Sequence, residues 1–221
     1  MSIKAFIFDM DGTLVDNCGY HVLAWREFSR KYGNELTEKQ ILDWMGAQGA
    51  YYIEQIMGRK LPAEEVDRLC REKEVLYRQI CRPEIPAGLR EWLDLAHAQG
   101  IRLAVATGGP PENVAFILDA LDLRKDFEII VDSSMYTRSK PAPDCFLAAA
   151  RRLGVDPSEC RVYEDALNGI RAAKAAGMQC HVVTFTNPRE TLAAAGPDLI
   201  FDSYRELKNF LVRGLTAAGG F

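Results

Sequence analysis

The chain has 221 residues, of which 48% are hydrophobic, so it can bury a sizeable core. Its 31 acidic residues outnumber its 27 Lys and Arg residues, and it has no basic run suited to tracking a nucleic-acid backbone. No apolar stretch is long enough for a membrane helix, and Asp9 interrupts the N-terminal apolar run too early for a secretory leader. We therefore expect a globular protein that binds neither nucleic acid nor a membrane.

The first predicted element is a strand over residues 3–8, a near-continuous apolar run of the kind that is buried on both faces of a parallel sheet. It ends directly before Asp-Met-Asp-Gly-Thr. A strand of this type delivers polar groups at its carboxyl end, so the residues after Phe8 are the first candidates for a functional site.

The next 65 or so residues depart from this pattern. Residues 17–82 contain no convincing strand, and helical spacing recurs there, as at Tyr20, Ala24 and Phe28. The segment is too long for a simple crossover, since a whole βαβ unit needs only about 30 residues. We therefore predict an all-helical cap domain over residues 17–82, inserted into a core domain of residues 1–16 and 83–221.

Strands and helices alternate in the rest of the chain. Helical patterns end before Gly100, begin at Pro110-Pro111 and end before Gly177. Further short apolar runs, each predicted as a strand, cover residues 103–106, 128–131, 161–163, 181–185 and 199–201. This alternation predicts an α/β core with a central parallel sheet flanked by helices.

Asp9 and Asp11 place two carboxylates two residues apart at the end of the first strand, where they point to the same side if strand geometry persists. One explanation is that Asp9 binds a hard cation and attacks phosphorus, while Asp11 exchanges a proton with the leaving group and then with water. Gly12 would permit the tight turn between them. The alternative is that Asp-Gly is ordinary turn chemistry at a strand end.

Three later segments also place polar side chains after predicted strands. Thr107 precedes a helix whose free N–H groups suit an anion, Lys140 lies in a loop stiffened by two prolines, and Glu164-Asp165 forms another acidic pair. Taken singly, each has a simpler explanation: Thr107 as a helix-start residue, Lys140 as a solvated charge, and the acidic pair as helix caps.

Taken together, the segments read Asp-x-Asp-Gly-Thr, then Thr, then Lys-Pro, then Glu-Asp, each at the end of a strand. This order resembles the haloacid dehalogenase-like (HAD) hydrolase superfamily over the whole chain, and the helical insertion matches that superfamily's first-site cap. The resemblance implies a HAD-like Rossmannoid core whose chain direction reverses beside the first strand, where open α/β sheets generally bind ligands.

The resemblance also implies a role for each motif residue. Asp9 would form an aspartyl-phosphate and Asp11 would act as general acid and base, while Lys140 would neutralise the nucleophile and the phosphoryl group. Thr13, Thr107 and the adjacent Gly108 would contact phosphoryl oxygens. Mg²⁺ would be held by Asp9, the Asp11 carbonyl and Asp165, with Glu164 as a direct or water-mediated ligand, an all-oxygen set that suits this ion.

Within the superfamily, the chain resembles the subgroup of β-phosphoglucomutase and small sugar-phosphate phosphatases, because residues 16–25 are similar to its first cap segment. That likeness implies substrate-positioning roles for His21 and Lys73, and Gln48 is a candidate specificity contact. From the residues alone, His21 is equally well a helix-face residue beside Trp25, and the charge-rich surroundings of Lys73 favour a solvated face.

Residues 46–49 read Gly-Ala-Gln-Gly, where the mutase carries an arginine that grips a second phosphate. We therefore predict a Mg²⁺-dependent phosphohydrolase acting on a small phosphorylated metabolite, such as a sugar phosphate. The alternatives are a β-phosphoglucomutase-type phosphotransferase, an inorganic pyrophosphatase, a phosphonate hydrolase and a non-catalytic binding module. The dehalogenases of this superfamily lack the second aspartate of the motif, so the presence of Asp11 argues against carbon–halogen cleavage.

The six cysteines are scattered, with no CxxC pair and no histidine at zinc-like spacing. We interpret nearly all of them as small buried apolar residues. A reducing cytoplasm is the simplest location, and we expect a monomer or weak homo-oligomer.

Overall fold

The computed structural model describes residues 2–44 and 49–208, and the chain divides into two compact units. One unit comprises residues 1–16 and 83–221, and the other comprises residues 17–82. We call the first unit the core and the second the cap.

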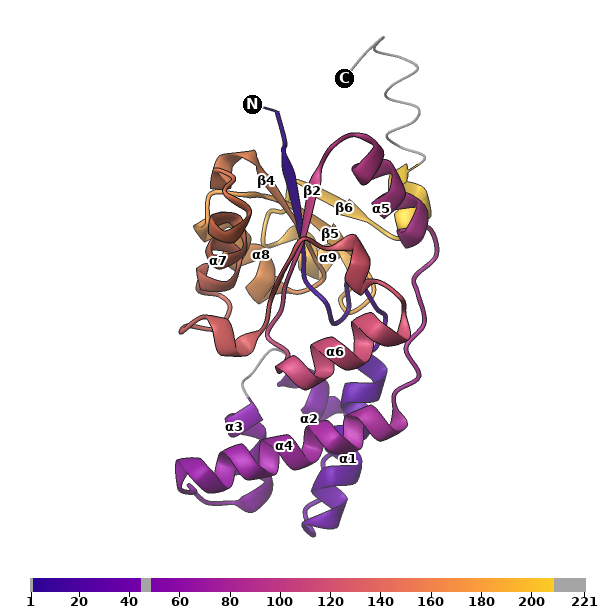
Figure 1. Ribbon diagram of the computed structural model, residues 1–221. Helices are drawn as coiled ribbons and strands as arrows, with labels where there is room; N and C mark the ends of the chain where they lie inside the picture. The colour runs from indigo at the N-terminus through magenta and orange to yellow at the C-terminus, as the bar shows by residue number, and fades with distance from the viewer. Residues whose placement is uncertain (1, 45–48, 209–221) are drawn as a thin grey trace. The chain divides into compact units, whose positions relative to one another are not determined.

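The core is built on a parallel sheet whose strands lie in the order β3-β2-β1-β4-β5-β6 (Figure 1). Every strand pairing in this sheet is parallel. The strand bounds are β1 Ala5–Phe8, β2 Arg102–Ala106, β3 Ile129–Val131, β4 Cys160–Glu164, β5 Gln179–Val183 and β6 Leu199–Phe201. The predicted parallel α/β fold is confirmed, with strand ends shifted by one or two residues at most positions.

Helices cover the two faces of this sheet. Those of the core are α5 Leu89–Ala98, α6 Pro111–Ala120, α7 Asp144–Leu153, α8 Leu167–Ala175 and α9 Arg189–Ala193. Short 3₁₀ helices lie at η1 Arg124–Asp126, η2 Ser133–Met135 and η3 Pro157–Glu159. In Figure 1, α7 and α8 lie together on one side, where α7 packs on β1, β2 and β3, and α8 packs on β4 and β5.

The two faces differ in composition because alternate residues of a strand point to opposite sides. On the face of α7 and α8, Ala5 and Ile7 of β1 pack among small and aliphatic side chains. On the other face, Phe8 stacks on Tyr163 with 4.5 Å between ring centroids, and Phe6 stacks on Trp92 of α5 at 5.8 Å. All four residues of β1 are buried, so its polar chemistry begins only where the strand ends.

β1 is the point where the chain changes direction across the sheet. β2 and β3 extend from one edge of β1, while β4, β5 and β6 extend from the other. The connections on the two sides therefore diverge above the carboxyl end of β1, which leaves room for a ligand there. This topology positions the residues after β1, β2 and β4 next to one another.

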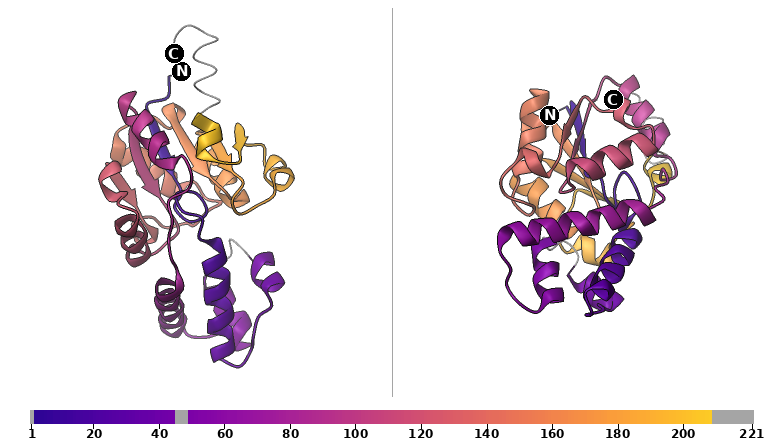
Figure 2. Two further views of the ribbon diagram at one scale, coloured as in Figure 1. Left: turned by 90° about the vertical axis from the view of Figure 1, so that its right-hand side faces the viewer. Right: turned by 60° about the horizontal axis from the view of Figure 1, so that its bottom comes forward.

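The cap contains the helices α1 Cys18–Lys31, α2 Glu38–Asp43, α3 Gly49–Met57 and α4 Ala63–Ile80 (Figure 2). Its apolar core includes Trp25 and Phe28 of α1 and Tyr52 and Ile53 of α3. Tyr52 stacks on Trp25 with 4.4 Å between centroids and donates a hydrogen bond to the Ile41 carbonyl. This tyrosine is thus a structural residue of the cap.

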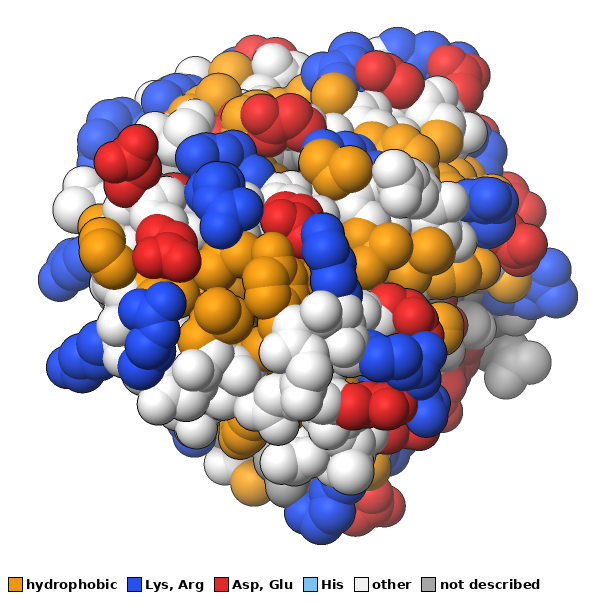
Figure 3. All heavy atoms as spheres, turned by 90° about the horizontal axis from the view of Figure 1, so that it is seen from below, with side chains coloured by type: hydrophobic (Ala, Val, Ile, Leu, Met, Phe, Trp, Pro, Cys, Tyr) orange, Lys and Arg blue, Asp and Glu red, His pale blue; other side chains and the backbone are white. Residues whose placement is uncertain are grey.

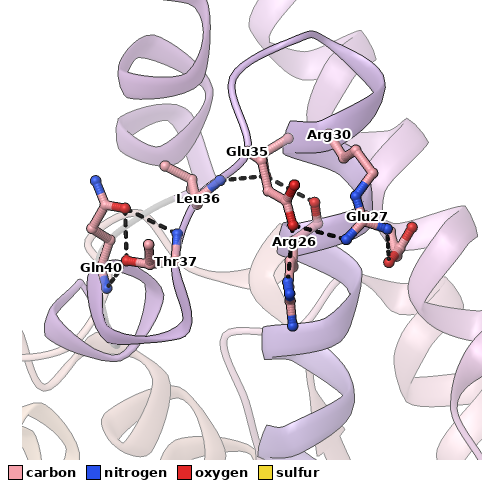
Figure 4. A network of polar contacts seen from close by, with 8 residues as sticks. Arg26, Glu27, Arg30, Glu35, Leu36, Thr37 and Gln40 are labelled. Atoms are coloured by element: carbon pink, nitrogen blue, oxygen red, sulfur yellow. Dashed lines mark hydrogen bonds and ion pairs between the residues drawn. The ribbon is translucent and has the colours of Figure 1, made fainter.

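Polar contacts tie α1 to the segment that follows it (Figure 4). Glu35 accepts hydrogen bonds from Arg26 at 3.2 Å and Arg30 at 2.8 Å. All three side chains are about half exposed. At the start of α2, the Gln40 side chain accepts from the Thr37 N–H and hydroxyl.

Acidic and basic side chains are interspersed on the face shown in Figure 3, with apolar side chains between them. Among the described residues, no helix is both long enough and apolar enough to cross a membrane. All six cysteines are free thiols. Cys81, Cys145, Cys160 and Cys180 are buried, whereas Cys18 and Cys70 are partly exposed, so the interpretation as small buried residues holds for four of them.

Candidate active site

Asp9 is the first residue after β1, and only 7% of its surface is exposed. Its N–H still donates to the Tyr163 carbonyl of β4 at 2.9 Å, so the strand ladder fixes its backbone. The chain then turns sharply: the Gly12 N–H donates to the Val15 carbonyl at 2.8 Å, and Gly12 has a φ of 78°, which favours glycine. These hydrogen bonds place Asp9 at the strand end, and Asp11 in the turn is partly exposed.

Lys140 reaches this position from the loop before α7. Its Nζ lies 2.5 Å from Asp9 Oδ1 and 2.7 Å from Glu164 Oε1. The same ammonium lies 4.8 Å from the centroid of the Phe146 ring on α7. Its side chain is only 14% exposed, so the alternative of a solvated loop lysine is wrong.

Glu164 is the last residue of β4 and is almost fully buried. Its Oε2 accepts the N–H groups of Asp165 at 2.8 Å and Ala166 at 2.9 Å, just before α8. One oxygen of the carboxylate therefore satisfies two backbone donors in the segment between β4 and α8, while the other accepts from Lys140. Glu164 thus bonds to the backbone ahead of α8 rather than to the free N–H groups within it, and it belongs to the charged cluster.

Three buried carboxylates, those of Asp9, Glu164 and Asp165, each place an oxygen within 4.8 Å of the others. Burial raises the pKa of Asp9 to about 7, although Lys140 opposes this. Burial also raises the Asp165 pKa well above its ordinary value, and the charges of Glu164 and Asp9 add to the rise. Burial alone would lower the pKa of Lys140, but Asp9 and Glu164 raise it well above its usual range.

If all three were ionised, these carboxylates would hold more negative charge than the Lys140 ammonium neutralises, which is why their pKa values rise. A divalent cation beside the three carboxylates would relieve their repulsion, and an all-oxygen donor set suits a hard ion such as Mg²⁺. The residues present therefore fit the expected metal.

The two threonines of the motifs are both buried. The Thr13 hydroxyl donates to Asp165 Oδ1 at 3.3 Å, so it contacts a carboxylate of the cluster. Thr107 Oγ accepts the Gly109 N–H at 3.0 Å, within the loop that contains Gly108. A Cβ at Gly109 would lie 3.4 Å from Thr107 Oγ and 3.6 Å from Asp11 Oδ2, so the β2–α6 loop lies against Asp11. The predicted phosphoryl contacts of Thr13, Thr107 and Gly108 stay predictions.

Of the predicted substrate contacts in the cap, Gln48 lies outside the described residues, as do Gly46 and Ala47. His21 and Lys73 form a pair: Lys73 Nζ lies 3.0 Å from His21 Nδ1, and the His21 ring stacks on Tyr77 at 3.9 Å. Lys73 is only 2% exposed, so the interpretation as a solvated charge is wrong. Lys73 packs near the Trp25 ring, with its Nζ 4.9 Å from the ring centroid. Sequence spacing does not reveal this contact.

Four residues that contribute to the site were not predicted from the sequence. Tyr136 donates to the Thr107 carbonyl at 3.2 Å, and Asn187 Nδ2 donates to the Asp165 carbonyl at 3.1 Å. Gly169 leaves space for Glu164, since a Cβ there would lie 1.8 Å from that carboxylate. Thr186 hydrogen-bonds to Asp165. Thr186 and Asn187 follow the strand predicted at residues 181–185, so the strand-end argument used for the other motifs could have found them.

A family model described as haloacid dehalogenase-like hydrolase matches residues 3–177. The putative phosphatase YhcW of Bacillus subtilis is 34% identical over 82% of this chain and 83% of its own length. The fructose-1-phosphate phosphatase YqaB of Escherichia coli is 35% identical over 78% and 92%. Among solved structures, a β-phosphoglucomutase from Clostridium difficile superimposes with a TM-score of 0.83 at 28% identity, over 96% of each chain.

Proposed function

The chain belongs to the haloacid dehalogenase-like hydrolase family, and we propose that it is a Mg²⁺-dependent phosphatase of small phosphorylated metabolites in which Asp9 attacks phosphorus. The family match and the relatives named as phosphatases confirm the predicted family and enzyme class. One observation carries the rest of the proposal: Asp9, Lys140, Glu164 and Asp165, from three distant segments, converge within hydrogen-bond or metal-ligand distance.

In the proposed reaction, a carboxylate oxygen of Asp9 forms a bond to phosphorus while the bond from phosphorus to the ester oxygen breaks. Asp11 gives its proton to the departing oxygen, and its carboxylate then takes a proton from the attacking water. The water oxygen bonds to phosphorus as the bond from phosphorus to Asp9 breaks, which releases inorganic phosphate and restores the Asp9 carboxylate. Lys140 hydrogen-bonds to Asp9 and reduces the repulsion between the carboxylate and an anionic substrate.

The Mg²⁺ ion would be held by Asp9, Asp165 and the Asp11 carbonyl, with Glu164 near it directly or through water. When bound, it would neutralise charge on the phosphoryl group and the carboxylates. The hydrogen bonds of Glu164 to two backbone N–H groups and to Lys140 favour the water-mediated arrangement, since both its oxygens already accept from the protein.

The proposal also covers the substrate class, the cellular compartment and the oligomeric state. A sugar phosphate is favoured because YqaB, whose name is fructose-1-phosphate phosphatase, is similar over 78% of the chain. We assign residues 17–82 as the family's cap, with His21, Gln48 and Lys73 as substrate contacts. Six free thiols fit a reducing compartment such as the cytoplasm, and a monomer or weak homo-oligomer is expected.

Turnover of an aryl phosphate and a panel of sugar phosphates, nucleotides and pyrophosphate tests this function. We expect activity that a chelator abolishes and Mg²⁺ restores. Asp9→Asn should lower kcat by roughly 10³-fold or more, as loss of a nucleophile does. Asp119→Asn, a change at an exposed carboxylate of α6 paired with Arg124, is the matched control and should behave like wild type.

Equal inactivity of wild type and Asp9→Asn across the panel would contradict the proposal and favour a binding module. A mutase remains the second candidate, because the β-phosphoglucomutase structure is similar and the His21–Lys73 pair is formed. Product analysis separates the two: a hydrolase releases inorganic phosphate in proportion to substrate consumed, whereas a mutase yields an isomerised sugar phosphate with little free phosphate.

A further inference from the structure

The Asp165 carboxylate has one neighbour that the four motifs do not supply. Its Oδ1 accepts from the Thr13 hydroxyl at 3.3 Å. Its Oδ2 lies 2.2 Å from the position that a Cβ on Gly12 would occupy, and the Thr186 hydroxyl oxygen lies 2.5 Å from the same position. The carboxylate and the Thr186 hydroxyl therefore converge on a space that exists because residue 12 has no side chain.

Thr186 reaches Asp165 because β5 pairs with β4. Glu164 is aligned with Val182 in this pairing, so the chain after β5 runs past the residue that follows β4. The next residue, Asn187, donates from Nδ2 to the Asp165 carbonyl at 3.1 Å. Two consecutive residues of the β5–α9 loop thus contact both the side chain and the backbone of Asp165.

The Asp165 carboxylate needs such support. It is only 3% exposed and lies beside two other carboxylates, which repel it. A hydroxyl that donates to an ionised carboxylate favours the charged form and limits its rotation. Thr186 hydrogen-bonds to the Asp165 side chain and so supplies such a donor.

We propose that Thr186 is a positioning residue that orients the Asp165 carboxylate for a divalent cation, and that Asn187 fixes the backbone of Asp165 in the same arrangement. The inference rests on the proposed function in one respect, that Asp165 is a ligand of Mg²⁺. Loss of a residue that supports a metal ligand typically weakens metal affinity by about 10–100-fold. The hydroxyl of Thr186, rather than its bulk, carries this role.

Isothermal titration of Mg²⁺ into the metal-free full-length protein tests the proposal. Thr186→Val keeps the shape of the side chain and removes the hydroxyl, and we expect the Kd for Mg²⁺ to rise about 10-fold or more. Thr186→Ser keeps the hydroxyl and should bind Mg²⁺ within about 3-fold of wild type, since the hydrogen bond to the carboxylate is retained. Thr184→Val is the matched control, because the Thr184 hydroxyl donates to Asp202 instead.

A kinetic measurement supplies a second readout. For Thr186→Val, the Mg²⁺ concentration that gives half-maximal activity should rise in step with the Kd, and saturating Mg²⁺ should recover most of the activity that is lost at low Mg²⁺. Circular dichroism and urea unfolding of the same samples establish that the variants are folded.

The possible outcomes separate this inference from the proposed function. If wild type binds Mg²⁺, Asp165→Asn does not, and Thr186→Val binds like wild type, the positioning role is wrong and the metal site stands. If Thr186→Ser is weakened as much as Thr186→Val, the hydroxyl is not the cause and the inference is also wrong. If wild type itself shows no Mg²⁺ binding, the proposed metal dependence fails first.

Discussion

The core and the cap each withdraw a lysine from solvent, but they surround it differently. Lys140 of the core lies between two buried carboxylates, Asp9 and Glu164. Lys73 of the cap lies 3.0 Å from Nδ1 of the His21 ring, and among the described residues it forms an ion pair with Glu74, whose side chain is 21% exposed. The core cluster thus gathers three carboxylates beside one lysine and favours a further cation, whereas the cap lysine is paired with a single carboxylate.

Replacement of each lysine by methionine is the strongest test of this difference. Lys140→Met leaves two buried carboxylates without their counter-ion, which should cost about 3–5 kcal/mol in the free energy of unfolding and about 10²–10³-fold in kcat. Lys73→Met should change stability less, because Glu74 can be hydrated. Urea unfolding of the metal-free proteins measures both.

Mg²⁺ sharpens the same test. Added Mg²⁺ should recover part of the stability lost in Lys140→Met and leave Lys73→Met unaffected, because only the core cluster is expected to bind it. Equal losses of stability in the two variants, with no Mg²⁺ effect, would show that the two clusters do not differ in the way described.

A pair of helical glycines extends the comparison to packing. A Cβ at Gly169 of α8 would lie 1.8 Å from the Glu164 carboxylate, whereas a Cβ at Gly19 of α1 would meet nothing within 4 Å. Gly169→Ala should therefore destabilise the core by about 1–3 kcal/mol and weaken Mg²⁺ binding. Gly19→Ala should stabilise the protein by about 0.5–1 kcal/mol, since alanine is the better helix former. Thermal unfolding distinguishes them, and a stabilising Gly169→Ala would refute the packing argument.

His181 of β5 makes the stability of the core depend on pH. Burial lowers its pKa to about 3, with the Arg161 charge contributing, and its Nδ1 has no hydrogen-bond partner among the described residues. Between about pH 6.5 and pH 3 the unfolded chain protonates this histidine while the folded chain does not, so stability falls as pH falls through this window. At pH 5.5 the loss should be about 1.4 kcal/mol relative to neutral pH.

The His181→Phe variant tests whether His181 causes this loss of stability at low pH. Its ring would remain against Tyr163, which His181 meets edge-on at 5.7 Å between centroids. Urea unfolding from pH 7 to pH 4.5 should show a shallower pH dependence for the variant than for wild type. Identical slopes would mean that other groups govern acid stability.

The smallest effect is expected at the cap's surface. Glu35 accepts hydrogen bonds from Arg26 and Arg30, and these interactions lower its pKa, but all three groups are about half exposed (Figure 4). Exposed ion pairs contribute little because water and salt screen them. Glu35→Gln should shift the urea midpoint less than any variant above, and 1 M salt should remove the shift. A large, salt-insensitive loss would overturn this view.

The strand-end pattern explains why much of the core was predictable. Asp9, Lys140 and Glu164-Asp165 each come after an apolar run that is predicted to be a strand. Parallel topology brings the ends of β1 and β4 together. The burial of Lys73 was not predictable, because a charged helical stretch has the same composition whether it faces solvent or packs near aromatic rings. The space that Gly12 and Gly169 provide likewise depends on which side chains approach them in the folded chain.

We propose that Asp9 becomes covalently phosphorylated during turnover. Rapid acid quench of the wild-type enzyme with Mg²⁺ and an aryl phosphate, followed by peptide mass spectrometry, tests it most directly. We expect one phosphoryl group on the peptide that contains Asp9, and none on that peptide from Asp9→Asn. A phosphoryl group on another residue, or turnover by Asp9→Asn at the wild-type rate, would contradict it.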